Sequence, residues 1–349
     1  MDDLISSQST CTPNPTPRLG FSDGSTAMPG IGFGTGFRSS FRGKPLEEAV
    51  HTFLTNGGRH IDTLEILGNL KEIGRGVCTS GVQRESIFLT ATINNAGPKF
   101  PWTSEAVQQS IELHLRQLEV YYLDVALLYV PFSWRQLSHG KKQGRLATMQ
   151  QIASAYQGLV TARASGKVRH IGVSNFARSH VEMLVNGTGM WPEVASVEFH
   201  PWVPRVVREH TRWLQDNGVV VLGHSPLGGC NHWDHWITTP WIKEESPVVL
   251  RMAAAHNASY SQALLRWGCD QGVAVTPGSN SVPHIIENLR LEGIKRFSSR
   301  EIEEIASSPK PRGFRCGACI GYGFRYEDGR STMVKKGGFI DFTAEHVIS

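Results

Sequence analysis

Side chains that can move protons stand at the ends of several short apolar runs. Asp62 follows "RHI", Tyr129 follows "LDVALL", and His224 follows "VVVLG". A carboxyl, a phenol and an imidazole are groups that proteins use for general acid–base catalysis. Other runs also end in polar or small residues, namely Thr92, Ser174-Asn175, His200 and Gly278-Ser279. If the runs are neighbouring strands, these residues meet at one edge and form an acid–base site.

The elements that would position these residues alternate between strand and helix patterns. Eight apolar runs predict strands: 59–63, 86–91, 123–130, 170–174, 195–200, 219–224, 273–278 and the weaker 288–293. Amphipathic segments such as 104–120 and 148–166 predict helices between them. This alternation predicts a parallel sheet. Eight units favour a (β/α)₈ TIM barrel, an α/β fold whose active site lies at the carboxyl ends of the strands.

The rest of the chain is assigned to segments around this barrel. Asp23-Gly24 predicts the turn of an N-terminal β-hairpin across the bottom. Residues 1–17, rich in Ser, Thr and Pro, are expected to be a flexible tail, and residues 18–349 a single barrel domain. Residues 131–140 and 228–247 are expected to be long loops over the carboxyl face.

Several side chains near the predicted mouth would shape a pocket for a bulky apolar small molecule. They are Leu67, Thr92, Trp102, Phe132, Trp134, Trp233 and Trp236.

Charge and composition argue against several other classes of protein. The net charge of +4 is small and scattered, so no nucleic-acid partner is expected. No apolar run is long enough to span a membrane, and the polar N-terminus predicts a cytoplasmic protein with free thiols. Cys316 and Cys319 supply only two metal ligands. Cys230, His232, Asp234 and His235 fit a solvated loop better than a metal site, so no metal is expected. The oligomeric state and the role of the cysteine pair stay open.

Six ordered motifs resemble the aldo-keto reductase family over residues 18–305. They are "MPGIGFGT", "GGRHIDT", "GKVRHIGVSNF", "VEFHP", "SPLG" and "SNSVPHIIENL". The resemblance implies a (β/α)₈ barrel, and for most members of that family it implies carbonyl reduction with NADPH.

The redox residues that this resemblance implies are mostly replaced. The family's Asp, Tyr, Lys and His fall on Asp62, Leu67, Thr92 and Tyr129. Leu67 cannot donate a proton and Thr92 carries no charge. Without the lysine cation, desolvation should raise the pKa of Asp62.

The cofactor residues are partly retained. Positions that match the family are Gly34, Thr35, Ser174, Asn175, Ser225, Ser279 and Asn288. Its Asn-Gln pair is here Ala195-Ser196, its stacking aromatic is His224, and its phosphate-binding Lys and Arg are Gly278 and His284. Losing two charge-assisted contacts should weaken the phosphate site.

Three functions remain open from these residues. The first, which the replaced redox residues favour, is a non-redox enzyme, a cyclase, lyase or isomerase of specialised metabolism, in which Asp62, Tyr129 and His224 supply acid–base groups. That hypothesis expects no cofactor. The second is an NADPH-dependent carbonyl oxidoreductase with a rearranged site and Tyr129 as proton donor. The third is a non-catalytic binding or regulatory barrel.

Overall fold

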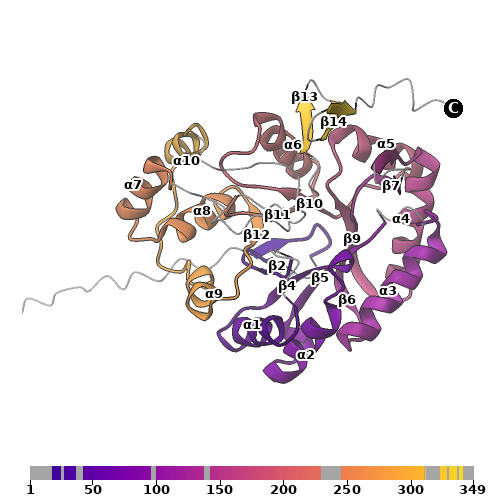
Figure 1. The fold of residues 1–349 in the computed structure, drawn as a ribbon, viewed down its shortest axis with the longest axis horizontal. Coiled ribbons are helices and arrows are strands. Elements are labelled where there is room, and N and C mark those ends of the chain that lie inside the picture. The colour runs from indigo at the N-terminus through magenta and orange to yellow at the C-terminus, as the bar shows by residue number, and fades with distance from the viewer. Residues whose placement is uncertain are drawn as a thin grey trace, which may run out of the picture.

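The protein is a (β/α)₈ barrel, which confirms the predicted fold (Figure 1). The computed structural model describes residues 18–24, 27–36, 42–95, 100–136, 142–228, 245–309, 311, 323–327, 330–335 and 338–340. The barrel strands are parallel and are β3 (Phe33–Gly34), β4 (His60–Leu64), β5 (Phe88–Ile93), β6 (Leu123–Leu128), β9 (Val168–Ser174), β10 (Val194–Glu198), β11 (Val220–His224) and β12 (Val273–Thr276).

The barrel closes where the first strand meets the last. Ile31 bridges to Val275 in parallel, and the amide of Gly32 donates to the Val275 carbonyl at 2.9 Å. Farther along this seam the amide of Gly34 donates to the Pro277 carbonyl at 3.0 Å. A Cβ on Gly34 would lie 2.5 Å from the carbonyl oxygen of Thr276, so only glycine allows the two strands to approach this closely.

Helices surround the barrel. The longer ones are α1 (Lys44–Thr55), α2 (Leu70–Ser80), α3 (Ser104–Leu118), α4 (Met149–Ala164), α5 (Arg178–Thr188), α6 (Arg205–Asp216), α7 (Pro247–Ala255), α8 (Tyr260–Cys269), α9 (Val282–Leu289) and α10 (Ser299–Ala306). Short 3₁₀ turns are η1 (Glu65–Leu67) and η2 (Arg84–Ser86). Helix starts follow local chemistry: Thr148 and Gln151 form a reciprocal capping box at α4.

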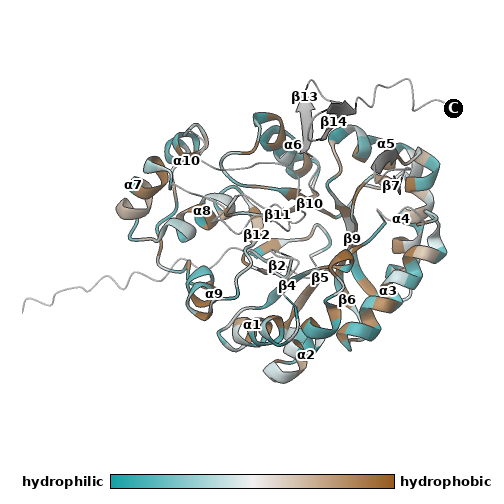
Figure 2. Ribbon diagram, viewed as in Figure 1, coloured by the Kyte–Doolittle hydropathy of each residue, from teal (hydrophilic) through white to brown (hydrophobic). Residues whose placement is uncertain are grey.

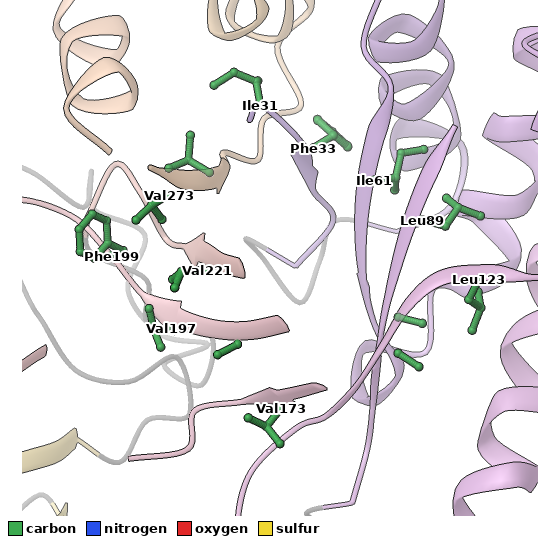
Figure 3. Close-up of a cluster of buried hydrophobic side chains, with 14 of the residues drawn as sticks. Ile31, Phe33, Ile61, Leu89, Leu123, Val173, Val197, Phe199, Val221 and Val273 are labelled. Atoms are coloured by element: carbon green, nitrogen blue, oxygen red, sulfur yellow. The ribbon is translucent and has the colours of Figure 1, made fainter. Parts of the chain in front are cut away.

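Two hydrophobic layers hold these elements together. The larger lies between strands and helices, and Figure 3 shows members such as Ile61, Leu89 and Val221. A smaller inner cluster fills the lower barrel and includes Val125 and Leu127, which alternate along β6 with outward-facing neighbours. The outer helices carry both hydrophobic and hydrophilic stretches, as expected for helices with one buried face (Figure 2).

The N-terminal hairpin seals the amino end of the barrel, as predicted. Strands β1 (Arg18–Gly20) and β2 (Ala27–Pro29) pair antiparallel, and Gly24 adopts φ 68°. Phe21, between them, stacks on His170 with ring centroids 3.5 Å apart and also faces Phe88. These rings close the bottom over the inner cluster.

Two expectations about the elements are wrong. The eighth strand is β3, not the run 288–293, because α9 extends to Leu289 and the chain then turns. Residues 131–140 are not a plain loop, since β7 (Phe132–Gln136) pairs antiparallel with β8 (Lys142–Leu146).

Other expectations concern residues outside the described part of the chain or beyond the barrel. The predicted tail, residues 1–17, lies outside the described residues, as do residues 229–244 of the second predicted loop. Beyond the barrel, β13 (Gly323–Glu327), β14 (Arg330–Lys335) and β15 (Gly338–Ile340) form a separate antiparallel sheet, and β13 contacts α6. The single-domain assignment of residues 18–349 stays a prediction.

No helix in the described parts of the chain is both long enough and apolar enough to cross a bilayer.

We predict that Phe21→Ala lowers the free energy of unfolding by about 3 kcal/mol, because it removes a buried ring and opens a cavity over the inner cluster. Urea unfolding followed by tryptophan fluorescence measures the change. Tyr121→Ala is the control: Tyr121 is 89% exposed, so its loss should change stability by less than about 0.5 kcal/mol. Equal stability of the Phe21 variant and the parent would contradict a sealing role for the hairpin.

Candidate active site

The carboxyl ends of the strands gather the predicted polar residues at one rim. Asp62 lies in the middle of β4, and Ser174 and His224 are the last residues of β9 and β11. Tyr129 directly follows β6. The strand register pairs Asp62 with Gly34 on one side and with Thr90 on the other, and pairs His224 with Glu198 and Thr276. Predicted acid–base and polar residues therefore lie on most sides of the barrel mouth.

Asp62 lies at the seam of the barrel. Its carbonyl oxygen accepts hydrogen bonds from the amide of Thr35 at 3.3 Å and from its hydroxyl at 2.8 Å. Its carboxylate Oδ2 accepts a longer hydrogen bond from Thr276 Oγ1 at 3.4 Å. Among the described residues no lysine or arginine forms an ion pair with Asp62.

This environment makes Asp62 an acid near neutral pH. Burial raises the pKa of Asp62 to about 7, and the hydrogen bond from Thr276 opposes this rise only in part. The direction is the one expected for a carboxyl whose counter-charge is missing. A carboxyl with such a pKa exchanges its proton readily at neutral pH, so it can act as a general acid or a general base.

The backbone of Tyr129 is fixed from two sides. Its amide donates to Asn95 Oδ1 at 2.6 Å, and its carbonyl accepts from Asn175 Nδ2 at 3.3 Å. The residue is 4% exposed.

His224 is linked to the same amide. Its Nε2 lies 3.1 Å from Asn175 Oδ1, and its Nδ1 lies 3.4 Å from Ser225 Oγ. Because Asn175 uses its NH₂ group toward Tyr129 and Ser174 Oγ, its oxygen must accept from His224. The Nε2 of His224 therefore carries a proton.

The residues that match a dinucleotide cradle also lie along this rim. Ser174, Asn175 and Ser279 are buried, and Asn175 and Ser225 adopt left-handed backbone conformations at φ 57° and 54°. Thr35 and Asn288 are buried as well. Ser196, on the neighbouring strand β10, is also buried.

The start of α9 offers backbone donors next to this cradle. Its N-terminus has no side-chain cap, although Ser279 Oγ accepts from the Ser281 amide at 3.1 Å just before it. Uncapped amides at a helix N-terminus bind anions such as phosphate. His284 is exposed on this helix. The residues present therefore fit a phosphate-bearing dinucleotide, with backbone amides where two cations were expected.

The predicted pocket residues are only partly placed. Thr92 and Phe132 are buried near the ends of β5 and β6, and Leu67 ends η1 at the mouth. Trp102 is buried in the layer between barrel and helices, edge-on to Phe100, which is a core position. The side chain of Trp134 and the residues Trp233 and Trp236 lie outside what the structure describes.

The cysteine pair Cys316 and Cys319 and the loop residues 230–235 are likewise not described. In the described remainder, no three His, Cys, Asp or Glu side chains are grouped as a metal site would require.

Two residues of the rim were not predicted. Thr276, the hydrogen-bond partner of Asp62, ends β12, and the rule that selected the other strand ends could have found it. Asn95 lies two residues beyond β5. No motif or spacing in the sequence pointed to it.

Comparisons with known proteins agree with the motifs in the sequence. A model described as the aldo/keto reductase family matches residues 30–309. A glyoxal reductase of Bacillus subtilis is 32% identical over 257 residues, covering 73% of this chain and 81% of that protein. An uncharacterized oxidoreductase of Schizosaccharomyces pombe is 29% identical over 293 residues, covering 81% of this chain and 86% of that protein.

Solved structures give the same fold. An aldo-keto reductase of Bombyx mori, solved in complex with NADP, has a TM-score of 0.70 at 24% identity, covering 84% of this chain and 92% of that chain.

These findings overturn the prediction that the protein works without a cofactor, since a relative of the same fold is in complex with NADP. The physical reason for the error lies at α9. That prediction rested on the missing cations at Gly278 and His284 and did not consider the uncapped backbone amides at the start of this helix. The two curated relatives are named as a reductase and an oxidoreductase, and neither name supports a cyclase, lyase or isomerase.

We predict that Asp62→Asn changes the pH dependence of stability. Because the pKa of Asp62 is raised from 3.8 to about 7 on folding, its proton stabilises the folded state fully below about pH 4. That contribution is lost as the pH rises through about 7. Asparagine stays neutral, so the melting temperature of the variant should rise relative to the parent between pH 5 and pH 8.

Differential scanning calorimetry at several pH values measures this trend. Asp216→Asn, on the exposed end of α6, is the matched control and should show none. A constant difference between Asp62→Asn and the parent across this range would contradict a raised pKa.

Proposed function

Because the chain belongs to the aldo/keto reductase family, we propose that it is an oxidoreductase that interconverts a carbonyl compound and its alcohol with NADP(H). The proposal is supported by the reductase and oxidoreductase relatives and by the silkworm structure in complex with NADP. It differs from the sequence-based preference for a non-redox enzyme, which the names of the relatives given above do not support.

The rim residues would hold the dinucleotide at its two ends. Ser174 and Asn175, buried at the end of β9, would bind the nicotinamide amide. Ser279 and the open amides of α9 would bind a phosphate. When bound, the reduced cofactor supplies the hydride.

The proton for the developing alkoxide would come from Asp62. Negative charge grows on the carbonyl oxygen as it accepts a hydride, and a donor must meet it there. Leu67 stands where a donor was expected and has no acidic proton. The raised pKa of Asp62, at a mouth where no described cation pairs with it, is the observation that carries this assignment. A neutral carboxylic acid both donates the proton and avoids repelling the oxygen.

Tyr129 would support this step as a second hydrogen-bond donor to the same oxygen. A phenol is ordinarily a weaker acid than a carboxyl, so Tyr129 would stabilise charge rather than supply the proton. His224 would shape the cradle through Asn175 and would not transfer the proton, because its Nε2 proton is already donated to Asn175.

The substrate would be an apolar carbonyl compound without a carboxylate. Leu67 and Phe132 give the described part of the mouth an apolar character. Asp62, when ionised, would repel an anion.

We predict that Asp62→Asn lowers the turnover of NADPH-dependent reduction of aromatic or aliphatic aldehydes by about 10²–10⁴-fold, because the amide cannot donate an acidic proton. Absorbance of NADPH at saturating cofactor measures the rate. Asp216→Asn should keep the parent rate. A variant at Asp62 with unchanged turnover would exclude it as the proton donor. If the parent protein binds NADPH but reduces none of the carbonyl compounds tested, the non-redox alternative would be favoured.

We predict opposite pH profiles for the two directions of the reaction. Reduction needs protonated Asp62, so its turnover should fall as the pH rises through about 7. Oxidation of the alcohol needs the ionised carboxylate and should rise over the same range. Steady-state rates from pH 5.5 to 9 test this, and both limbs should be absent from the residual activity of Asp62→Asn. Parallel profiles in the two directions would contradict the assignment.

A further inference from the structure

The side chain of Asn95 replaces strand pairing at the place where the barrel ladder ends. The β5–β6 ladder stops at the pair Ile93 and Leu128. Beyond it, Asn95 Oδ1 accepts from the amides of Tyr129 at 2.6 Å and Val130 at 3.3 Å. Its Nδ2 donates to the Val130 carbonyl at 2.5 Å. One side chain thus bonds three backbone groups of two residues.

Asn95 is fully buried, so water cannot take over these bonds. Leaving a buried backbone amide without a partner costs the desolvation of that group. The segment Tyr129–Val130 therefore depends on Asn95 for its place.

The opposite side of Tyr129 is held by a second amide. Asn175 Nδ2 donates to the Tyr129 carbonyl, and the Asn175 backbone amide donates to the Ser196 carbonyl at 2.8 Å. His224 fixes the other end of the Asn175 side chain. Two buried amides from neighbouring strand ends thus clamp the Tyr129 backbone.

The chain leaves the barrel immediately after this clamp. Pro131 follows Val130, and β7 begins at Phe132 as part of a hairpin that stands apart from the barrel sheet. The next backbone bond in this direction runs from the Ala147 amide to the Pro131 carbonyl. Among the described hydrogen bonds to the Tyr129–Val130 backbone, loss of Asn95 would leave the one from Asn175 as the link to the barrel rim.

We infer that Asn95 is a positioning residue, which holds Tyr129 so that its phenol can reach the carbonyl oxygen of the substrate. This inference rests on the proposed function, in which Tyr129 donates a hydrogen bond to that oxygen. Catalytic groups must be held within about 0.5 Å of their productive place. A backbone shift at Tyr129 moves the phenol with it, while Asp62 on β4 keeps its own bonds to Thr35 and Thr276.

A double-mutant cycle tests this dependence. Asn95→Ala should lower turnover by about 10- to 100-fold, because a misplaced catalytic group costs up to about this factor. In a Tyr129→Phe background the same change should cost less than about twofold, since the positioned group is already gone. The KM for NADPH should change less than turnover does, because Asn95 bonds Tyr129 and Val130 and, among the described hydrogen bonds, none of the cradle residues directly. Equal losses of turnover in both backgrounds would overturn the inference.

Gln215→Ala is the matched control for stability. Gln215 also bonds two backbone carbonyls, those of Gln271 and Gly272, at 2.9 and 3.0 Å, far from the rim. It should lower the melting temperature while leaving turnover unchanged. If it lowers turnover as much as Asn95→Ala at equal loss of stability, the effect of Asn95 is general destabilisation and the inference fails.

A second measurement separates this inference from the proposed function. Fluorotyrosine incorporated at all seven tyrosines gives ¹⁹F NMR signals, and Tyr129→Phe identifies the one from Tyr129. Asn95→Ala should shift or broaden that signal, whereas Gln215→Ala should leave it in place. This readout needs no activity, so it tests the clamp even if no carbonyl is reduced. An unmoved Tyr129 signal would overturn the inference. Should Asn95→Ala not fold, Asn95→Ser carries the same expectations.

Discussion

The close approach of the first and last strands at the barrel seam is the constraint on which the candidate site depends. Gly34 lies against the Thr276 carbonyl so closely that no Cβ fits between them. This contact joins β12 to β3, the strand beside β4, and brings the Thr276 hydroxyl within 3.4 Å of the carboxylate of Asp62. The same seam aligns Thr35 with the Asp62 carbonyl. An ordinary side chain at position 34 would separate the strands and remove the hydrogen-bond partners of the acid together.

Alternating apolar runs and amphipathic segments were enough to predict the barrel. The position of active sites in such barrels was enough to select Ser174 and His224, which end β9 and β11, and Asp62, which lies within β4. The eighth strand was misassigned because β3 has only two residues, too few for a periodic pattern. The β7–β8 hairpin was missed because β8 is mostly polar and no tight-turn signature joins the two strands. Asn95 could not be found from sequence, because its role exists only through the backbone of a neighbouring strand.

The error about the cofactor has a different origin. The missing cations at Gly278 and His284 are only part of what determines whether this site binds phosphate. The uncapped first turn of α9 presents the N–H groups of Val282 and His284, although not of Pro283, and the positive end of a helix dipole, and neither needs a charged side chain. Replacement of side chains is therefore a weaker argument against a ligand when the site is built largely from backbone. The aspartate kept without its lysine was the more informative change, since it alters the acidity of a group at the mouth.

The hairpin that seals the bottom of the barrel has a consequence for the timing of proton exchange. Phe21, stacked on His170, and the apolar inner cluster place buried side chains between the amino end of the barrel and Asp62. Exchange of the Asp62 proton with bulk solvent is therefore expected to run mainly through the mouth, which is also the entrance for ligands. Once a ligand covers that entrance, the carboxyl keeps whatever proton it held at that moment. The protonation state of Asp62 would then be set once for each binding event.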